Sequence, residues 1–372
     1  MPTDLGLRFI VEPTGPELTS EEAELLKELR PGGVMFRSRN FLRDVPYAEW
    51  RATYAKLLSD VRQAIGREKL LVSIDHEGGR VHRFPAPITR FPYPAFYAHS
   101  LEAVELVSRA MAVELRSLGI NHSCSPTADI HSNPDNPVIN QRAFGTKAQD
   151  VARAAVRCAQ TLRSEGIVPC AKHFPGHGDT ASDSHYSLPT LDRSLDELRQ
   201  REFVPFKALI DDGIETIMTA HIVAPQVDAA RQATISPVLL RTVLRDELGF
   251  RGLTIADALG MQAIRSDVAG SEFALQAHQA GLDLFLFVGD PVSIKDAIAT
   301  RDSLRAAHVD GRISTESILD VERRLSSFLA RLPQYPVVEM PAESLAAHAR
   351  LADSLNLNAP FAPFHFEPKG FD

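Results

Sequence analysis

Cysteine is scarce in this chain of 372 residues, which has only Cys124, Cys158 and Cys170. A small, odd number of thiols excludes a disulfide framework and fits a reducing compartment. We therefore expect each thiol to be a small buried apolar group and not a nucleophile.

The sequence also lacks long apolar runs and blocks of like charge. No stretch approaches the roughly 20 apolar residues of a membrane-spanning helix. The N-terminal sequence MPTDLGLRFIVEPTG has no basic segment followed by an apolar run, so we expect no signal peptide and a cytoplasmic protein. The formal net charge is −8 and Lys and Arg are not clustered, which argues against nucleic acid and anionic membranes as partners.

What the sequence does contain is a regular alternation of short apolar runs and longer amphipathic segments. Eight β-rich runs occupy residues 7–11, 33–36, 70–75, 120–126, 168–172, 216–221, 253–257 and 282–287. Helical patterns fill the gaps, at residues 19–30, 100–119, 194–213 and 236–249 among others, and Thr19 with Glu22 forms a capping-box signature.

This alternation predicts an α/β fold with a parallel sheet. Eight repeats favour closure into a TIM-type (β/α)8 barrel, with an open doubly wound sheet as the alternative. We place the barrel at residues 1–333. The Pro-rich segment 334–372 is predicted to be an irregular tail that packs on the barrel or on a partner subunit. The sequence leaves the oligomeric state open.

Ionisable residues stand at the ends of five consecutive predicted strands: Asp75, Asp129, Lys172 with His173, His221 and Asp257. Ionisable groups are costly to bury, and barrels of this kind build their active sites at the carboxyl ends of the strands. The pattern therefore predicts a polar catalytic pocket there.

The segment KHFPGHGDTASDSH, residues 172–185, is rich in such groups. Its Pro and Gly residues predict a loop, which presents Asp183 two residues before His185. A carboxylate beside an imidazole favours the protonated ring, as a general acid and base requires. Taken alone, the pair would be better explained as an inert surface contact.

Five motifs together resemble glycoside hydrolase family 3, in its bacterial β-N-acetylhexosaminidase branch. They are GGVMF with Asn40, IDHEGGRVHRF, NQRAFG, KHFPGHGDTASDSH and ELGFRGLTIADALGM. The resemblance implies a retaining hydrolase that releases terminal β-linked N-acetylglucosamine from small carbohydrate substrates, without metal or cofactor, in peptidoglycan recycling. It departs from the family at His76, where relatives usually have Gln.

The resemblance also implies roles for individual residues. Asp257 matches the catalytic nucleophile, and His185 paired with Asp183 matches the acid/base. The positions that match sugar-binding residues are Asp75, Arg83, Arg142, Lys172 and His173.

Four other functions stay open at this point. The same fold could carry a β-glucosidase or β-xylosidase, or a phosphorylase that uses phosphate as acceptor. A metal-dependent hydrolase would bind zinc through histidines such as His173, His177, His185 and His221 with Asp257, although Pro175 and Gly176 break helical ligand spacing. A non-catalytic sugar-binding barrel is expected to lack the nucleophile or the acid/base pair, and both are present.

Overall fold

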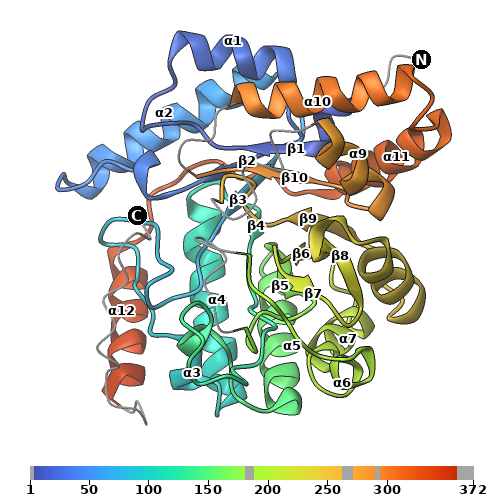
Figure 1. Cartoon of the computed structure of the whole chain (residues 1–372). Helices are drawn as coiled ribbons and strands as arrows, with labels where there is room; N and C mark the ends of the chain where they lie inside the picture. Colours follow the sequence, from blue (N-terminus) through green and yellow to red (C-terminus); the bar gives the residue numbers. More distant parts are fainter. Residues whose placement is uncertain (1–3, 181–187, 262–270, 290–293, 358–372) are drawn as a thin grey trace.

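The computed structural model describes residues 4–180, 188–261, 271–289 and 294–357. Its centre is a parallel eight-stranded sheet in the order β10-β1-β2-β3-β4-β5-β6-β9 (Figure 1). The strands are β1 (Phe9–Val11), β2 (Gly33–Phe36), β3 (Leu71–Ile74), β4 (His122–Ser123), β5 (Val168–Phe174), β6 (Thr216–Thr219), β9 (Leu253–Ala256) and β10 (Phe285–Phe287). Each of the eight predicted runs therefore contains a strand.

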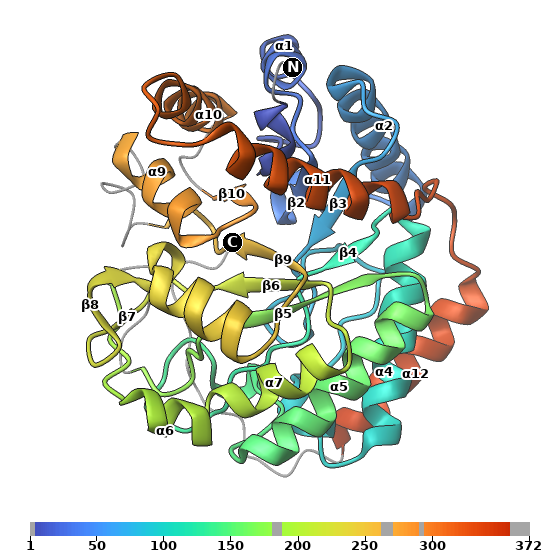
Figure 2. The same ribbon diagram turned by 90° about the vertical axis from the view of Figure 1, so that its right-hand side faces the viewer.

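The sheet closes on itself between its two end strands. Ile255 of β9 forms a parallel bridge with Leu284, directly before β10. The main-chain N–H groups of Ala256 and Leu284 donate across this junction, each over 2.9 Å. Helices surround the strands in Figure 2, so the predicted (β/α)8 barrel is confirmed.

The helices that flank the strands mostly follow the predicted pattern. The main ones are α1 (Ser20–Leu29), α2 (Tyr47–Ile65), α4 (Leu101–Ser117), α5 (Ala148–Ser164), α6 (Leu195–Gln200), α7 (Phe203–Asp211), a helix at Val238–Glu247, α9 (Ser271–Ala280), α10 (Ile294–Val309) and α11 (Thr315–Arg331). At α1 the capping box is present: the Thr19 hydroxyl accepts from the Glu22 N–H, and the Glu22 carboxylate accepts from the Thr19 N–H.

Alternate residues along each strand face two different apolar layers, as the pleat of a strand requires. Ile10, Met35 and Leu286 belong to the cluster inside the barrel, whereas Phe9 and Phe36 pack with the surrounding helices. The three thiols are free and buried, as expected. Burial raises the pKa of Cys170 to about 12, which keeps that thiol protonated.

Two parts of the fold before residue 334 differ from the prediction. Residues 194–213 form two helices, because the ring of Pro205 conflicts with a helical carbonyl at Arg201 and α7 restarts at Phe203. A two-stranded hairpin, β7 (Val223–Ala224) with β8 (Asp228–Gln232), follows β6 and was not predicted.

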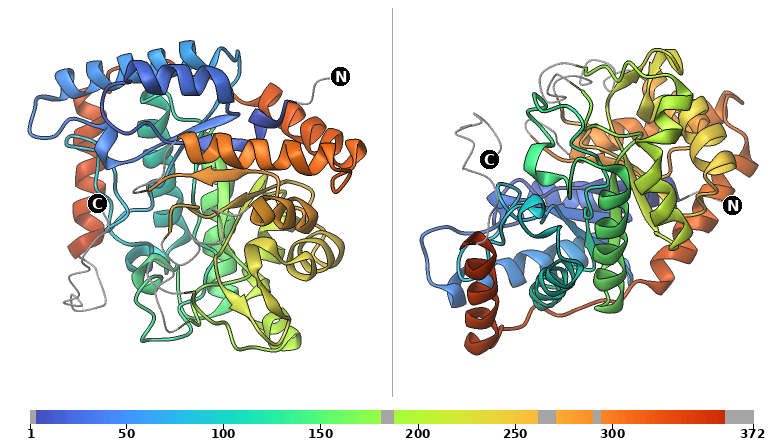
Figure 3. Two further views of the ribbon diagram at one scale, coloured as in Figure 1. Left: turned by 45° about the horizontal axis from the view of Figure 1, so that its top comes forward. Right: turned by 90° about the horizontal axis from the view of Figure 1, so that it is seen from below.

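The prediction of an irregular tail from residue 334 is wrong over α12 (Ala342–Leu357). This segment is rich in Ala and Leu, and such good helix formers outweigh the surrounding prolines. The helix packs beside α4 and the short α3 (Pro94–Tyr97), and His348 contacts the buried Glu114 over 2.8 Å (Figures 1 and 3). The boundary at 333 stays a prediction. Among the described helices, none combines the length and the apolar character needed to cross a membrane.

Candidate active site

The polar residues predicted from the strand ends do gather at one end of the barrel. Asp75 directly follows β3, Lys172 and His173 lie in the last half of β5, and Asp257 directly follows β9. All strands of the barrel are parallel, so these residues share its carboxyl-terminal face.

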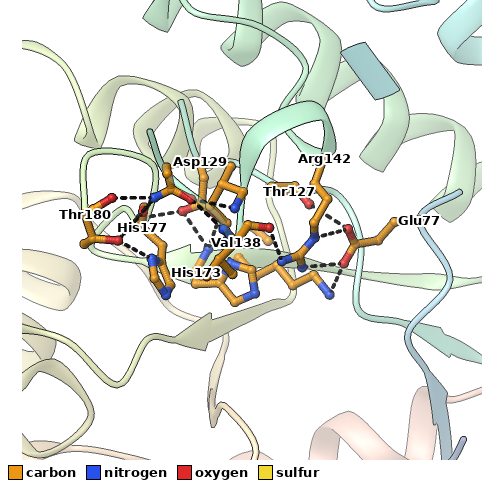
Figure 4. A network of polar contacts seen from close by, with 12 residues as sticks. Glu77, Thr127, Asp129, Val138, Arg142, His173, His177 and Thr180 are labelled. Atoms are coloured by element: carbon orange, nitrogen blue, oxygen red, sulfur yellow. Dashed lines mark hydrogen bonds and ion pairs between the residues drawn. The ribbon is translucent and has the colours of Figure 1, made fainter. Parts of the chain in front are cut away.

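The first cluster joins five charged side chains: Asp75, Glu77, Arg83, Arg142 and Lys172. The Lys172 ammonium lies 2.6 Å from a carboxylate oxygen of Asp75 and 2.5 Å from one of Glu77. The Arg142 guanidinium donates two parallel hydrogen bonds to Glu77, over 2.8 and 2.9 Å. Arg83 lies 3.7 Å from the other oxygen of Asp75. Figure 4 shows the Arg142 guanidinium and the Glu77 carboxylate in direct contact.

The charges of this cluster reinforce one another. Burial alone would raise the pKa of Glu77, but Arg142 and Lys172 hold it well below its ordinary value. Burial would lower the pKa of Lys172, but Asp75 and Glu77 hold it above its ordinary value. The side chain of Asp75 is 23% exposed, whereas those of Glu77 and Lys172 are almost fully buried. Asp75 is therefore a partly exposed, ionised acceptor, as hydroxyl recognition requires.

A second cluster is organised by the fully buried Asp129. One of its oxygens lies 2.7 Å from Nδ1 of His173, and the other accepts the main-chain N–H of His177 over 2.7 Å. The His177 ring in turn contacts the Thr180 hydroxyl over 2.8 Å (Figure 4). Since a carboxylate only accepts, Nδ1 of His173 carries the proton and Nε2 is its other polar atom. Asp129 thus fixes the loop after β5 and the orientation of His173.

We expect Asp129→Asn to destabilise the fold, because an amide cannot accept all the hydrogen bonds that this carboxylate accepts. The loss should be roughly 1.5–3 kcal/mol for each charge-assisted bond that is broken, measured by urea unfolding at pH 7. Burial would raise the pKa of Asp129, but contacts led by His173 hold it below its ordinary value. Its stabilisation is therefore present above about pH 4 and is lost as the pH falls further. A difference between variant and wild type that stayed constant down to pH 3 would contradict this assignment.

The third group surrounds Asp257. Its side chain is half-buried and accepts the main-chain N–H of Ala258 over 2.7 Å. Its carbonyl oxygen lies 3.1 Å from Nε2 of His221, which must be the donor, so Nδ1 accepts from the Thr234 hydroxyl 2.9 Å away. Burial lowers the pKa of His221, which keeps this ring neutral at pH 7. His221 thereby holds the chain at Asp257 in place.

Asp257 also acts electrostatically on the Asp129 cluster. Burial and the charge of His173 together lower the pKa of His177 to about 4, against the opposing charges of Asp129 and Asp257. The clusters built on Asp129 and Asp257 are therefore neighbours in one site. Within the residues that the structure describes, no group of three or more His, Cys, Asp or Glu side chains is arranged to hold a metal ion.

Residues 7–327 match the glycosyl hydrolase family 3 N-terminal domain. The chain belongs to glycoside hydrolase family 3. It is 38% identical over 297 residues to a β-hexosaminidase of Methylococcus capsulatus, a match that covers 77% of this chain and 85% of that protein.

Solved structures of family 3 proteins have the same fold. A β-N-acetylglucosaminidase from Paenibacillus sp. matches with a TM-score of 0.84 and 32% identity, over 96% of this chain and 68% of that one. NagZ from Neisseria gonorrhoeae, in complex with N-trifluoroacetyl-D-glucosamine, matches with a TM-score of 0.73 and 28% identity, over 94% and 97% of the two chains. The resemblance read from the five motifs is therefore confirmed at the level of the family.

The structure brings together most of the site residues expected of a family 3 enzyme. One charge network contains Asp75, Arg83, Arg142 and Lys172. The ring of His173 lies 5.9 Å from that of His177, whose pKa is affected by the charge of Asp257. Asp183 and His185 lie outside the described residues, so their predicted pairing remains a prediction.

The sequence did not single out Glu77, although it lies within the IDHEGGRVHRF motif. Its carboxylate is the link between Lys172 and Arg142, which are 30 residues apart. The available signal was a carboxylate two residues beyond a strand end in a chain segment predicted to be buried. His177, one of the histidines considered as a zinc ligand, contacts the Thr180 hydroxyl within the loop after β5.

Proposed function

We propose that the chain is a retaining β-N-acetylhexosaminidase that releases terminal β-linked N-acetylglucosamine. The observation that carries this proposal is the position of Asp257, directly after β9, on the same barrel face as the ionised Asp75 cluster directly after β3. Relatives named β-hexosaminidase over most of their length support the sugar specificity.

Asp257 acts as the nucleophile in this proposal. A carboxylate oxygen bonds to the anomeric carbon as the bond to the leaving oxygen breaks, and His185 gives its proton to that oxygen. Water then attacks the glycosyl ester and loses a proton to His185, which restores both groups. Asp183 favours the protonated imidazole before the first step.

The remaining site residues hold the sugar. Asp75 presents a partly exposed carboxylate to hydroxyl groups, and Arg83 lies beside it. The Lys172 ammonium has three donors, of which Asp75 and Glu77 use two, so one remains for a hydroxyl. Nε2 of His173 is the ring nitrogen that can bind a hydroxyl, because Nδ1 is hydrogen-bonded to Asp129. Arg142 has N–H groups beyond those that contact Glu77 and the Val138 carbonyl.

A panel of nitrophenyl glycosides tests this function. We expect kcat/KM for the β-N-acetylglucosaminide to exceed that for the β-glucoside and β-xyloside. The rate should not require phosphate, and the product in phosphate buffer should be free N-acetylglucosamine. A preference for the glucoside or xyloside, or formation of a sugar 1-phosphate, would favour the corresponding alternative enzyme.

The physiological substrate in this proposal is a cell-wall fragment in peptidoglycan recycling. Such a fragment has N-acetylglucosamine at its non-reducing end and an anhydro-muropeptide as leaving group. Release of N-acetylglucosamine from purified anhydro-muropeptides, measured by mass spectrometry, tests this finer statement.

The acid/base role of His185 predicts a dependence on the leaving group. His185→Ala should slow cleavage of alkyl glycosides, whose leaving oxygen needs a proton, by about 10²- to 10⁴-fold. Dinitrophenyl glycosides should be attacked by Asp257 at nearly the wild-type rate, because their leaving group is already a good one. Equal losses on the two substrates would remove His185 from this role. His99→Ala, at an exposed histidine after α3, is the control.

A further inference from the structure

A cavity of about 780 Å³ adjoins the charge network at Arg83, between the loops that follow β2 and β3. Its polar lining is dominated by five arginines, Arg39, Arg43, Arg80, Arg83 and Arg90, with Ser38 and His82 beside them. No lining residue is Asp or Glu, and all of these residues lie in the described part of the chain. Its size is in the range of small-molecule sites.

Two of the lining arginines, Arg43 and Arg90, are held by main-chain carbonyls, which leaves their charge in place. Arg43 donates to the main-chain carbonyl of Arg83 over 3.0 Å, and Arg90 donates to that of Gly79 over 3.0 Å. A carbonyl orients a guanidinium without neutralising it. Two other arginines lie near carboxylates that do not line the cavity. Glu12 lies 2.6 Å from Arg39, and Asp75 lies 3.7 Å from Arg83.

The positive charge of the cavity also affects the pKa of His82. Burial lowers its pKa to about 4, and Arg90, Arg43 and Arg83 each contribute in the same direction. Its ring lies 5.1 Å from that of His76, which is buried and whose two ring nitrogens have no hydrogen-bond partner. Both rings therefore remain neutral at pH 7, and the arginines supply the charge of the cavity.

The cavity lies away from the nucleophile. In the closed sheet, β3 and β9 are separated by β4, β5 and β6 on one side and by β2, β1 and β10 on the other, so they face each other across the barrel. Asp257 follows β9, and Arg83 lies in the loop after β3. A sugar with its anomeric carbon at Asp257 and its distal hydroxyls at Asp75 therefore turns its non-reducing end toward the cavity.

We propose that this arginine-lined cavity binds a phosphoryl group, and that the group is carried on the end of the sugar opposite the scissile bond. The placement rests on the proposed function, whereas the chemistry of the cavity does not. A phosphoryl group has a charge of about −1.5 to −2 and three acceptor oxygens, so it can engage several guanidinium groups at once. A hydroxyl carries no charge, and a single carboxylate has a charge of −1 and two acceptor oxygens, so each complements this lining less well.

Calorimetry with N-acetylglucosamine, N-acetylglucosamine 6-phosphate and inorganic phosphate tests the proposal. We expect wild-type protein to bind the 6-phosphate at least about tenfold more tightly than the unphosphorylated sugar, as one or two charge-assisted contacts would provide. The double variant Arg43→Gln/Arg90→Gln should lose this advantage. Both residues are exposed, so folding should be retained, and the thermal midpoint checks it. Arg323→Gln, at an exposed arginine of α11, is the control and should keep the advantage.

The outcomes distinguish a phosphoryl group carried on the sugar from free inorganic phosphate. Binding of inorganic phosphate that depends on Arg43 and Arg90, without any gain for the 6-phosphate, would support the cavity chemistry and overturn its placement on the sugar. Equal affinity for sugar and sugar phosphate, with phosphate binding unchanged in the double variant, would overturn the proposal. Hydrolysis of nitrophenyl β-N-acetylglucosaminide by wild type, measured separately, shows whether the proposed function itself holds.

Discussion

Replacing Asp257 with Asn should reduce kcat for nitrophenyl β-N-acetylglucosaminide by about 10⁴-fold or more, the loss typical of removing a covalent nucleophile. The amide has nearly the same shape as the carboxylate, and its oxygen can still accept from the Ala258 N–H. The link from His221 reaches the main-chain carbonyl of this residue and does not depend on its side chain. The fold and the stability should therefore be nearly unchanged, and the loss should be chemical.

A trapping experiment separates a nucleophile from a residue that only stabilises charge. A 5-fluoro N-acetylglucosaminide with a good leaving group keeps the acetamido group, forms the glycosyl ester quickly and hydrolyses it slowly. Peptide mapping should find the added mass on Asp257 in wild type and on no peptide of the Asp257→Asn variant. Asp246→Asn, at an exposed position on the Val238–Glu247 helix, should retain wild-type kinetics. A label on another carboxylate would reassign the nucleophile.

The barrel could be predicted because buried parallel strands require nearly continuous apolar runs. Residues 33–36 and 253–257 show this directly, and the structure places strands there. The end of the chain could not be predicted in the same way. α12 follows a Pro-rich stretch, and it is stabilised by contacts with α3 and α4 that lie far away in sequence.

The site residues that could be predicted are those whose position along a strand fixes the end of the barrel at which they lie. Asp75, Lys172 and Asp257 follow from that rule, since each stands at the carboxyl end of a strand. The direction in which a loop side chain points does not follow from it. Glu77 and Arg142 lie on different loops, and only the folded chain shows that one carboxylate pairs with both Arg142 and Lys172.

Replacing Glu77 with Gln should be among the most destabilising single substitutions in the described part of the barrel. The change leaves Lys172 and Arg142 buried with one fewer carboxylate, and breaking a buried ion pair costs about 3–5 kcal/mol. The free energy of unfolding, measured in urea at pH 7, should fall by that amount. Glu339→Gln removes an exposed partner of Arg51 and should cost about 1 kcal/mol or less, which makes it the matched control.

The loss of stability in the Glu77→Gln variant should depend on pH. Because the pKa of Glu77 in the folded protein lies well below its ordinary value, its contribution is complete above about pH 4.3 and is lost as the pH falls below that value. The difference between wild type and Glu77→Gln should therefore be constant from pH 8 to pH 5 and shrink at lower pH.

Activity gives a second measurement on the same variant. At a temperature where it remains folded, kcat/KM should fall by about 10²-fold, because Lys172 and Arg142 lose their common anchor and a displacement near 1 Å is enough for such a loss. A stable variant with wild-type kinetics would mean that the two cations are positioned by other contacts. Their proposed role in holding the sugar would then have to be argued without Glu77.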